Sequence, residues 1–195
     1  MKPDKNTPIP GSLHPDDDPT AGPLRLRGAA DVACLVPYLL GFHPHDSIVA
    51  MLCLDGRLKL TARIPLKMAT HPLTFDAQLR QLGVRFPTAQ WIFAGYGEER
   101  PVVEDGLRLA VDLVGSDSVV DAIYVASDRY WSVLCSNPTC CPAEGVTYDS
   151  TASPAVLQAV VAGLQAADSR EQLVERIRPP RGWTARAARL RLDNA

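Results

Sequence analysis

The fold is decided by residues 24–66, which read LRLRGAADVACLVPYLLGFHPHDSIVAMLCLDGRLKLTARIPL. The spacing of apolar residues predicts a helix over residues 29–36, and Pro37 stops or kinks it because proline has no backbone N–H to donate. The near-continuous apolar run Ser47–Leu54 is typical of a central strand that is buried on both faces. A helix, a polar corner and a buried strand are therefore expected in that order.

The buried strand leads into a hairpin. Asp55 and Gly56 form a strong two-residue turn signal. Apolar and polar residues then alternate over residues 57–66, which predicts a strand with one apolar face toward the core and one basic face that carries Arg63. Such a basic face can contact phosphates, but it is more often solvated or covered by a partner.

Helices and strands alternate along the rest of the chain. The patterns predict helices over residues 73–82, 102–114, 154–166 and 169–178 and strands over residues 90–96, 119–127 and 130–135. Thr70 or Thr74 is expected to cap the first of these helices, and Ser169 with Gln172 the last. Strand–helix–strand order is typical of parallel crossover units. The expected fold class is α/β, a single domain over residues 24–180 with helices packed on the faces of a mixed, mostly five-stranded sheet.

Two tails flank the expected domain. Residues 1–23 are rich in proline, aspartate and threonine, so a disordered arm is expected because this composition cannot bury enough apolar surface. Residues 181–195 form a basic amphipathic segment. This segment can contact nucleic acid through phosphates, although docking of Trp183 and Leu190 on the same chain or on a second copy is the commoner use of such a face.

Length, charge and composition restrict the class of protein. The chain has 195 residues and a formal net charge of −2, which gives the whole molecule no attraction to nucleic acid or anionic lipid. No apolar run approaches the roughly 18–20 residues of a membrane helix, and the N-terminus lacks the apolar core of a secretory signal. A cytoplasmic protein without membrane contact is expected. The sequence also lacks a glycine-rich phosphate loop, a serine nucleophile elbow and a zinc-protease motif.

Three local motifs resemble one protein family. They are LRGAADVACLVPYLLGFHPHDSIV (residues 26–49), RYWSVLCSNPTCCPAEG (residues 129–145) and SREQLVERIRPP (residues 169–180). Across residues 24–180 they are similar to an actinobacterial family known as domain of unknown function number 4192. The resemblance implies a bacterial or bacteriophage origin and a cytoplasmic location, and it carries no activity. It also implies that a function housed beyond residues 179–180, where many members continue, is missing here or supplied by a partner.

The polar corner GFHPHDS, residues 41–47, is the first candidate site. His43, His45 and Asp46 stand at the entry of the buried strand, where imidazole groups can hold a metal ion or move protons near neutral pH. The alternative is a corner whose backbone is fixed by proline, with Asp46 and Ser47 hydrogen-bonded to local amides. The residues alone leave both interpretations open.

Cys135, Cys140 and Cys141 form the second candidate site. Thiolates bind zinc well, and His43 or His45 completes a four-ligand set if the corner and this segment are neighbours in the fold. The usual spacing of two residues between paired cysteines is absent, so packing of small thiols within the loop is the alternative. The sequence therefore requires no cofactor, and zinc is the metal that these residues suggest.

A third candidate site lies beside these cysteines. Arg129 and Trp131 precede them, and Glu144 follows. An arginine over an aromatic ring can clamp an anion or a planar ligand. The alternative is an arginine that fixes the loop by hydrogen bonds to carbonyl groups.

These observations lead to three functional hypotheses. The first is a non-catalytic binding or regulatory protein that acts through protein contacts, as a homodimer or with a host or regulatory partner. The second is a hydrolase-like enzyme whose pocket is formed jointly by the GFHPHDS corner and the cysteine-rich loop. The third is binding of nucleic acid through the basic C-terminal segment, which the net charge disfavours.

Overall fold

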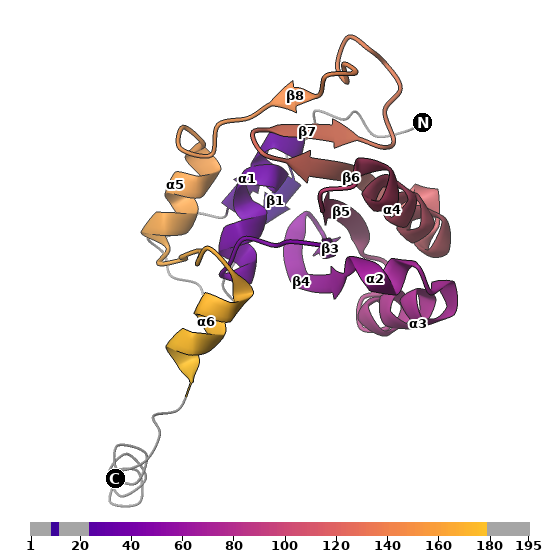
Figure 1. Ribbon diagram of the computed structural model, residues 1–195, viewed down its shortest axis with the longest axis horizontal. Coiled ribbons are helices and arrows are strands. Elements are labelled where there is room, and N and C mark those ends of the chain that lie inside the picture. Colours follow the sequence, from indigo (N-terminus) through magenta and orange to yellow (C-terminus); the bar gives the residue numbers. More distant parts are fainter. Residues whose placement is uncertain (1–8, 12–23, 179–195) are drawn as a thin grey trace, which may run out of the picture.

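The structure, a computed structural model, describes residues 9–11 and 24–178 (Figure 1). The strands are β1 (Ile9–Gly11), β2 (Leu24–Leu26), β3 (Ser47–Leu54), β4 (Arg57–Pro65), β5 (Gln90–Tyr96), β6 (Val119–Ala126), β7 (Arg129–Ser132) and β8 (Val146–Thr147). The helices are α1 (Ala29–Leu40), α2 (Leu66–Ala69), α3 (Pro72–Gly83), α4 (Arg100–Val114), α5 (Pro154–Val161) and α6 (Arg170–Ile177), with a 3₁₀ turn at Ser116–Ser118.

A mixed sheet covered by helices forms the centre of the domain, as the sequence predicts. In the described part of the chain this sheet has six strands in the order β4-β3-β5-β6-β7-β8. The prediction of five strands is wrong by one because β8 is only two residues long and lies within a loop. Its residues pair with β7, where Arg129 lies opposite Thr147 and Tyr130 opposite Val146.

Strand direction decides which loops meet at each edge of the sheet. β5 and β6 are parallel and are joined by α4, which confirms the predicted crossover. β3 runs antiparallel to both β4 and β5. The start of β3 therefore meets the carboxyl end of β5, with Ser47 opposite Tyr96.

The two faces of β3 supply two apolar cores, because this strand is buried on both sides as predicted. Val49, Met51 and Cys53 pack beneath α1 and α5. The alternate residues Ile48, Ala50 and Leu52 pack beneath α2, α3 and α4. Figure 1 shows α1 and α5 on one side of the sheet and α2, α3 and α4 on the other.

The predicted hairpin forms at Asp55 and Gly56, whose φ angles of 51° and 70° fit a left-handed two-residue turn. One detail of the prediction for β4 is wrong. A register shift pairs Cys53 with Leu58 but Leu52 with Leu60. The extra residue turns Leu58 toward the α1 side of the sheet and leaves Leu60 on the other side. The apolar side chains of β4 therefore do not share one face.

Helix α1 extends beyond its predicted end, because Pro37 lies inside it and Gly41 ends it with φ of 80°. Pro37 is buried and has no N–H, so the carbonyl of Ala33, four residues earlier, has no helical donor. The predicted helix over residues 154–166 ends sooner than expected, at Val161.

Capping groups were predicted correctly for α6 and wrongly for α3. The Ser169 hydroxyl accepts a hydrogen bond from the backbone N–H of Gln172 at 3.3 Å. His71 precedes α3 without a side-chain cap, and the Thr70 hydroxyl instead donates to the carbonyl of Lys67 at the end of α2. Proline at the first position of α3 needs no cap for its missing N–H.

Helix α4 is packed closely against the sheet and carries an ion-pair network. A Cβ atom at Gly95 of β5 would lie 2.4 Å from Cγ1 of Val103, so this glycine allows the close approach. On the outer side, Glu104 pairs with Arg100 at 2.6 Å and with Arg108 at 3.0 Å. Partial burial raises the pKa of Glu104, but hydrogen bonds from these arginines outweigh it, and the pKa lies below the usual value.

Most of both predicted tails lies outside the described residues. Residues 9–11 of the predicted arm form β1, which pairs in antiparallel fashion with β2 at the start of the predicted domain. The basic segment predicted over residues 181–195 is not among the described residues. In residues 9–11 and 24–178, no helix combines the length and the apolar character needed to cross a membrane. The cytoplasmic location stays a prediction.

Candidate functional site

A cleft of about 1250 Å³ opens at the carboxyl ends of the parallel strands β5 and β6. Gly97 and Glu98 follow β5, Ser127 and Asp128 follow β6, and all four line it. Residues 43–46 join them because they lead into β3, whose first residue lies opposite the last residue of β5. Ligands of open α/β sheets bind at this edge.

The GFHPHDS corner forms one rim of the cleft, and hydrogen bonds from Arg63 and Ser47 fix its backbone. The Arg63 guanidinium donates to the Ser47 hydroxyl at 3.1 Å and to the carbonyl of His45 at 3.0 Å. The Ser47 hydroxyl also donates to that carbonyl at 2.7 Å. Asp46 is held at φ 40°, which is strained for aspartate. Arg63 and Ser47 therefore position the corner, while His43, His45 and Asp46 line the cleft.

The C-terminal part of the domain clamps the same corner. The backbone N–H of His43 donates to the carbonyl of Ala167 at 2.9 Å, and the N–H of Ala167 donates to the carbonyl of Gly41 at 2.8 Å. These two bonds form a short parallel bridge between Phe42 and Ala167. They also bring Asp168 to the cleft wall.

The cleft is strongly acidic. It is lined by five carboxylates, those of Asp46, Glu98, Asp128, Asp149 and Asp168. Among the described residues, no lysine or arginine lines it. Hydrogen bonds from the hydroxyl and backbone N–H of Thr151 hold the pKa of Asp149 below its usual value, so this carboxylate is ionised at neutral pH.

Four of the five tyrosines of the chain also line the cleft: Tyr38, Tyr96, Tyr124 and Tyr148. Two of their hydroxyls are satisfied, since Tyr124 donates to the carbonyl of Gly97 at 3.1 Å and Tyr148 to that of Ser127 at 2.9 Å. The hydroxyl of Tyr96 is buried and has no hydrogen-bond partner within the described part of the chain. Burial, with Tyr148 and Cys34 close by, raises its pKa well above the usual value.

Helix α1 contributes one wall of the cleft. Ala33, Cys34, Pro37 and Tyr38 all line the cleft. The carbonyl of Ala33 is the one that Pro37 leaves without a helical donor. Burial raises the pKa of the Cys34 thiol despite a hydrogen bond with Ser153, so the thiol is protonated at neutral pH.

The second feature is a group of three thiols between β7 and β8. The sulfur atoms of Cys135, Cys140 and Cys141, here called the thiol cluster, lie within 4.8 Å of one another. The Cys135 and Cys140 sulfurs are 3.2 Å apart. Burial, followed by hydrogen bonds with the two other thiols, raises the pKa of Cys141 to about 12.

Arg129 and Trp131 hold the loop that carries this cluster. The Arg129 guanidinium donates to the carbonyls of Glu144 at 3.1 Å and Gly145 at 3.2 Å, as the second interpretation of this arginine predicts. Trp131 donates through its indole N–H to the carbonyl of Ala143 at 3.0 Å. The cation over the Trp131 ring is not Arg129, however.

Arg100 at the start of α4 is the residue that stacks on Trp131, with its guanidinium carbon 4.5 Å from the ring centroid. The predicted clamp of Arg129 over Trp131 is therefore wrong. Glu144 is exposed and lines a small hollow together with Arg129 and Cys140. This hollow is separate from the cleft.

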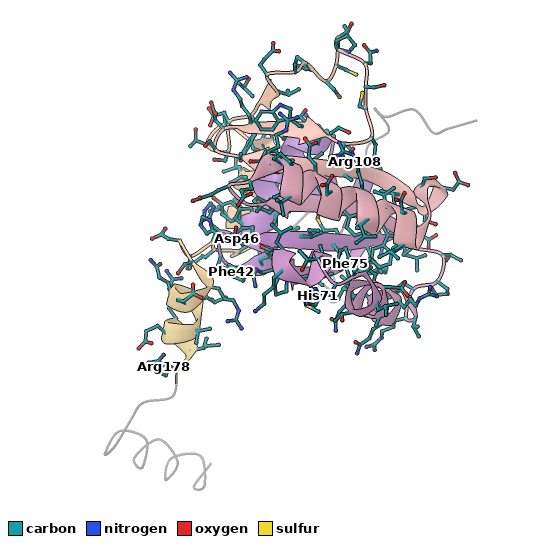
Figure 2. The ribbon with its side chains drawn as sticks, turned by 45° about the vertical axis from the view of Figure 1, so that its right-hand side comes forward. Phe42, Asp46, His71, Phe75, Arg108 and Arg178 are labelled. Atoms are coloured by element: carbon teal, nitrogen blue, oxygen red, sulfur yellow. The ribbon has the colours of Figure 1, made fainter. Side chains whose placement is uncertain are left out.

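The corner and the thiol cluster do not share a pocket, although a composite site was predicted. His43 lines the cleft, whereas Cys140 lines the smaller hollow, and the group of candidate metal ligands contains the three cysteines without His43. In Figure 1 the loop between β7 and β8 projects away from the connection between α1 and β3. Figure 2 shows Phe42 and Asp46 at a distance from that loop in a second view. The four-ligand zinc site with His43 is therefore wrong.

Sequence reasoning missed much of the cleft. Tyr96, Glu98, Asp128 and Tyr148 were not nominated, yet they line it together with the corner. Glu98 and Asp128 follow two strands that were predicted to be parallel, and a position just after such strands indicates a ligand-binding edge of the sheet. No comparable signal marks Tyr148, because it follows the unpredicted strand β8.

The fold and the cleft define a single-domain α/β protein with an acidic, tyrosine-lined cleft at the carboxyl edge of its parallel strands. A family model described as domain of unknown function (DUF4192) matches residues 30–195, and the chain belongs to that family. The resemblance noted in the sequence is thereby confirmed, while a bacterial or bacteriophage origin stays a prediction. A search among curated proteins and another among solved structures each returned no match.

Proposed function

We propose that this protein is a non-catalytic binding protein whose cleft holds a small organic polycation, such as an aliphatic polyamine. The observation that carries the proposal is the composition of the cleft. Five carboxylates surround it, and within the described ranges neither lysine nor arginine lines it to offset their charge. A cleft of one charge sign attracts ligands of the opposite sign.

The tyrosines support an organic cation over an inorganic one. Aromatic faces attract ammonium and guanidinium groups, and the methylene groups of a polyamine pack on the same rings. Tyr38 and Tyr148 are the partly exposed tyrosines of the cleft, so their rings are the ones that a ligand can reach.

The state of the one thiol in the cleft disfavours catalysis by a nucleophilic cysteine there. Cys34 is buried, and its raised pKa keeps it in the protonated, weakly nucleophilic form. The hydrolase hypothesis depended on the corner and the thiol cluster acting together, and these lie at separate hollows. The nucleic-acid hypothesis depends on residues 181–195, which are not among the described residues.

Calorimetric titration with spermidine tests the proposal. We expect binding that weakens as salt is raised, because the attraction is between charges near the surface. Glu98→Gln removes one exposed cleft carboxylate, and we expect a loss of about 0.5–1 kcal/mol, or roughly two- to fivefold in affinity. Asp76→Asn is the matched control because Asp76 lies on α3 in an ion pair with Arg80. Affinity insensitive to both salt and Glu98→Gln would count against the proposal.

A second proposal concerns self-association, for which the outer face of α5 is the candidate surface. Leu157, Val160 and Val161 are 66%, 50% and 76% exposed and occupy one side of the helix at spacings of three and four residues. We propose that a second copy of the chain covers this face. Monomeric soluble proteins rarely expose contiguous apolar patches larger than a few hundred Å², and larger ones mark interaction sites.

Light scattering tests the dimer. Leu157→Lys is expected to shift the mass from dimer to monomer, because it places a charge in the centre of the apolar face. Leu73→Lys is the matched control, since Leu73 is 87% exposed on α3. A monomeric mass for the unaltered protein at high concentration, or equal effects of the two variants, would overturn this proposal.

A further inference from the structure

The thiol cluster has the dimensions of a metal site. All three sulfur atoms lie within 4.8 Å of one another, and one pair is 3.2 Å apart. Two sulfurs bound to one Zn²⁺ at about 2.3 Å in tetrahedral geometry are about 3.8 Å apart. The sulfur atoms therefore need to move by less than about an ångström to reach a common ion.

Hydrogen bonds within the loop hold these thiols in place. The carbonyl of Asn137 accepts hydrogen bonds from the backbone N–H groups of Cys140 at 3.3 Å and Cys141 at 2.8 Å. The side-chain oxygen of Asn137 accepts another from the N–H of Thr139 at 2.9 Å. This tight turn brings two adjacent cysteines back toward Cys135. Such preorganisation lowers the conformational cost of binding an ion.

The far end of the loop is also fixed. Gly145 has φ of 82°, and a Cβ atom there would lie 2.4 Å from the Trp131 ring. Only glycine allows this close approach, which places the carbonyls of residues 143–145 against the donors of Trp131 and Arg129. Both ends of the segment that carries the thiols are therefore anchored to β7.

We propose that Cys135, Cys140 and Cys141 bind a single thiophilic metal ion of the Zn²⁺ class, at a site separate from the cleft. Three sulfur ligands select zinc and softer ions over magnesium or calcium, which prefer oxygen. Arg129 lines the same hollow as Cys140, so its positive charge offsets the net negative charge of three thiolates around a divalent ion. With Cys140 exposed, the fourth position is open to water.

Metal analysis of the untagged protein, refolded or purified in reducing buffer with Zn²⁺, tests the proposal. We expect one zinc ion per chain. Co²⁺ in its place is expected to give thiolate charge-transfer bands. The Cys140→Ser and Cys141→Ser variants are expected to lower the affinity by more than about 100-fold, since changes in the outer shell of a metal site already cost 10–100-fold.

Two controls separate this site from other sources of binding. Cys34→Ser removes a thiol in the cleft, and His43→Ala removes an imidazole there, so both are expected to bind zinc normally. Alkylation followed by mass spectrometry gives a readout on the unaltered protein, in which zinc is expected to protect the three clustered thiols. The proposal would be overturned if Cys140→Ser still took up zinc, if His43→Ala failed to take it up, or if the unaltered protein bound none.

Discussion

Removing the hydroxyl of Tyr96 is predicted to stabilise the protein, which is the opposite of what most core substitutions do. The hydroxyl is buried and has no hydrogen-bond partner within the described residues. An unpaired buried hydroxyl costs about 1–3 kcal/mol. Tyr96→Phe removes this cost and leaves only a small void, so we expect a gain of about 1 kcal/mol in the free energy of unfolding. For a chain of this size that gain raises Tm by about 2–4 °C.

Tyr148→Phe is the matched comparison, because it deletes the same atom from a second tyrosine of the cleft. The Tyr148 hydroxyl donates to the carbonyl of Ser127 at 2.9 Å. Losing this hydrogen bond is expected to cost about 1 kcal/mol. The two variants should therefore differ by about 2 kcal/mol, with opposite signs relative to the unaltered protein.

Urea denaturation followed by circular dichroism measures both values, provided that the slope of free energy against urea is unchanged. The reasoning is refuted if Tyr96→Phe is destabilised as much as Tyr148→Phe. That result would mean that the Tyr96 hydroxyl is hydrogen-bonded in solution.

Three further predictions concern the scaffold. Gly95→Ala places a Cβ atom 2.4 Å from Val103, and we expect a loss of about 1–3 kcal/mol in urea unfolding. Glu104→Gln is expected to cost about 0.5–1 kcal/mol at neutral pH. Because the folded pKa of Glu104 is depressed, its contribution to the free energy of unfolding is complete above the unfolded pKa of 4.5 and is lost as pH falls through the folded pKa. The unaltered protein and Glu104→Gln should therefore become equally stable in acid. Ser153→Ala removes the hydroxyl that caps α5, and thermal unfolding should show a loss of about 1 kcal/mol.

The elements with strong periodicity were predictable from the sequence. The bounds of β3 and β5 match their predictions because each is a continuous apolar run that the sheet buries on both faces. The Asp55-Gly56 turn depends on local backbone preference alone, so its hairpin also followed directly. Local signals of this kind do not depend on the rest of the fold.

Features that depend on tertiary contacts were not predictable. Pro37 stays inside α1 because burial of the helix offsets the missing hydrogen bond, and no local pattern reports that burial. The register shift opposite Leu58 and the two-residue strand β8 are likewise set by neighbouring strands. These predictions failed because packing against neighbouring strands and helices determines the features, and the preferences of single residues do not report it.

The candidate site likewise has a part that was predictable from the sequence and a part that was not. The three cysteines were found as a group because they lie within seven consecutive residues. Their separation from His43 depends on strand order, which the sequence did not provide. Tyr96 was assigned to a strand without a role, because its position at the cleft follows from its pairing with Ser47.

The bridge between Phe42 and Ala167 has a consequence for biosynthesis. One rim of the cleft is held by backbone bonds to a residue made 125 positions later, so a nascent chain cannot complete the cleft until nearly the whole domain has left the ribosome. A ligand of the cleft therefore binds only the completely folded domain, and by mass action it stabilises that folded state against unfolding. Proteolysis of the chain near residue 165 should abolish that protection while leaving the sheet intact.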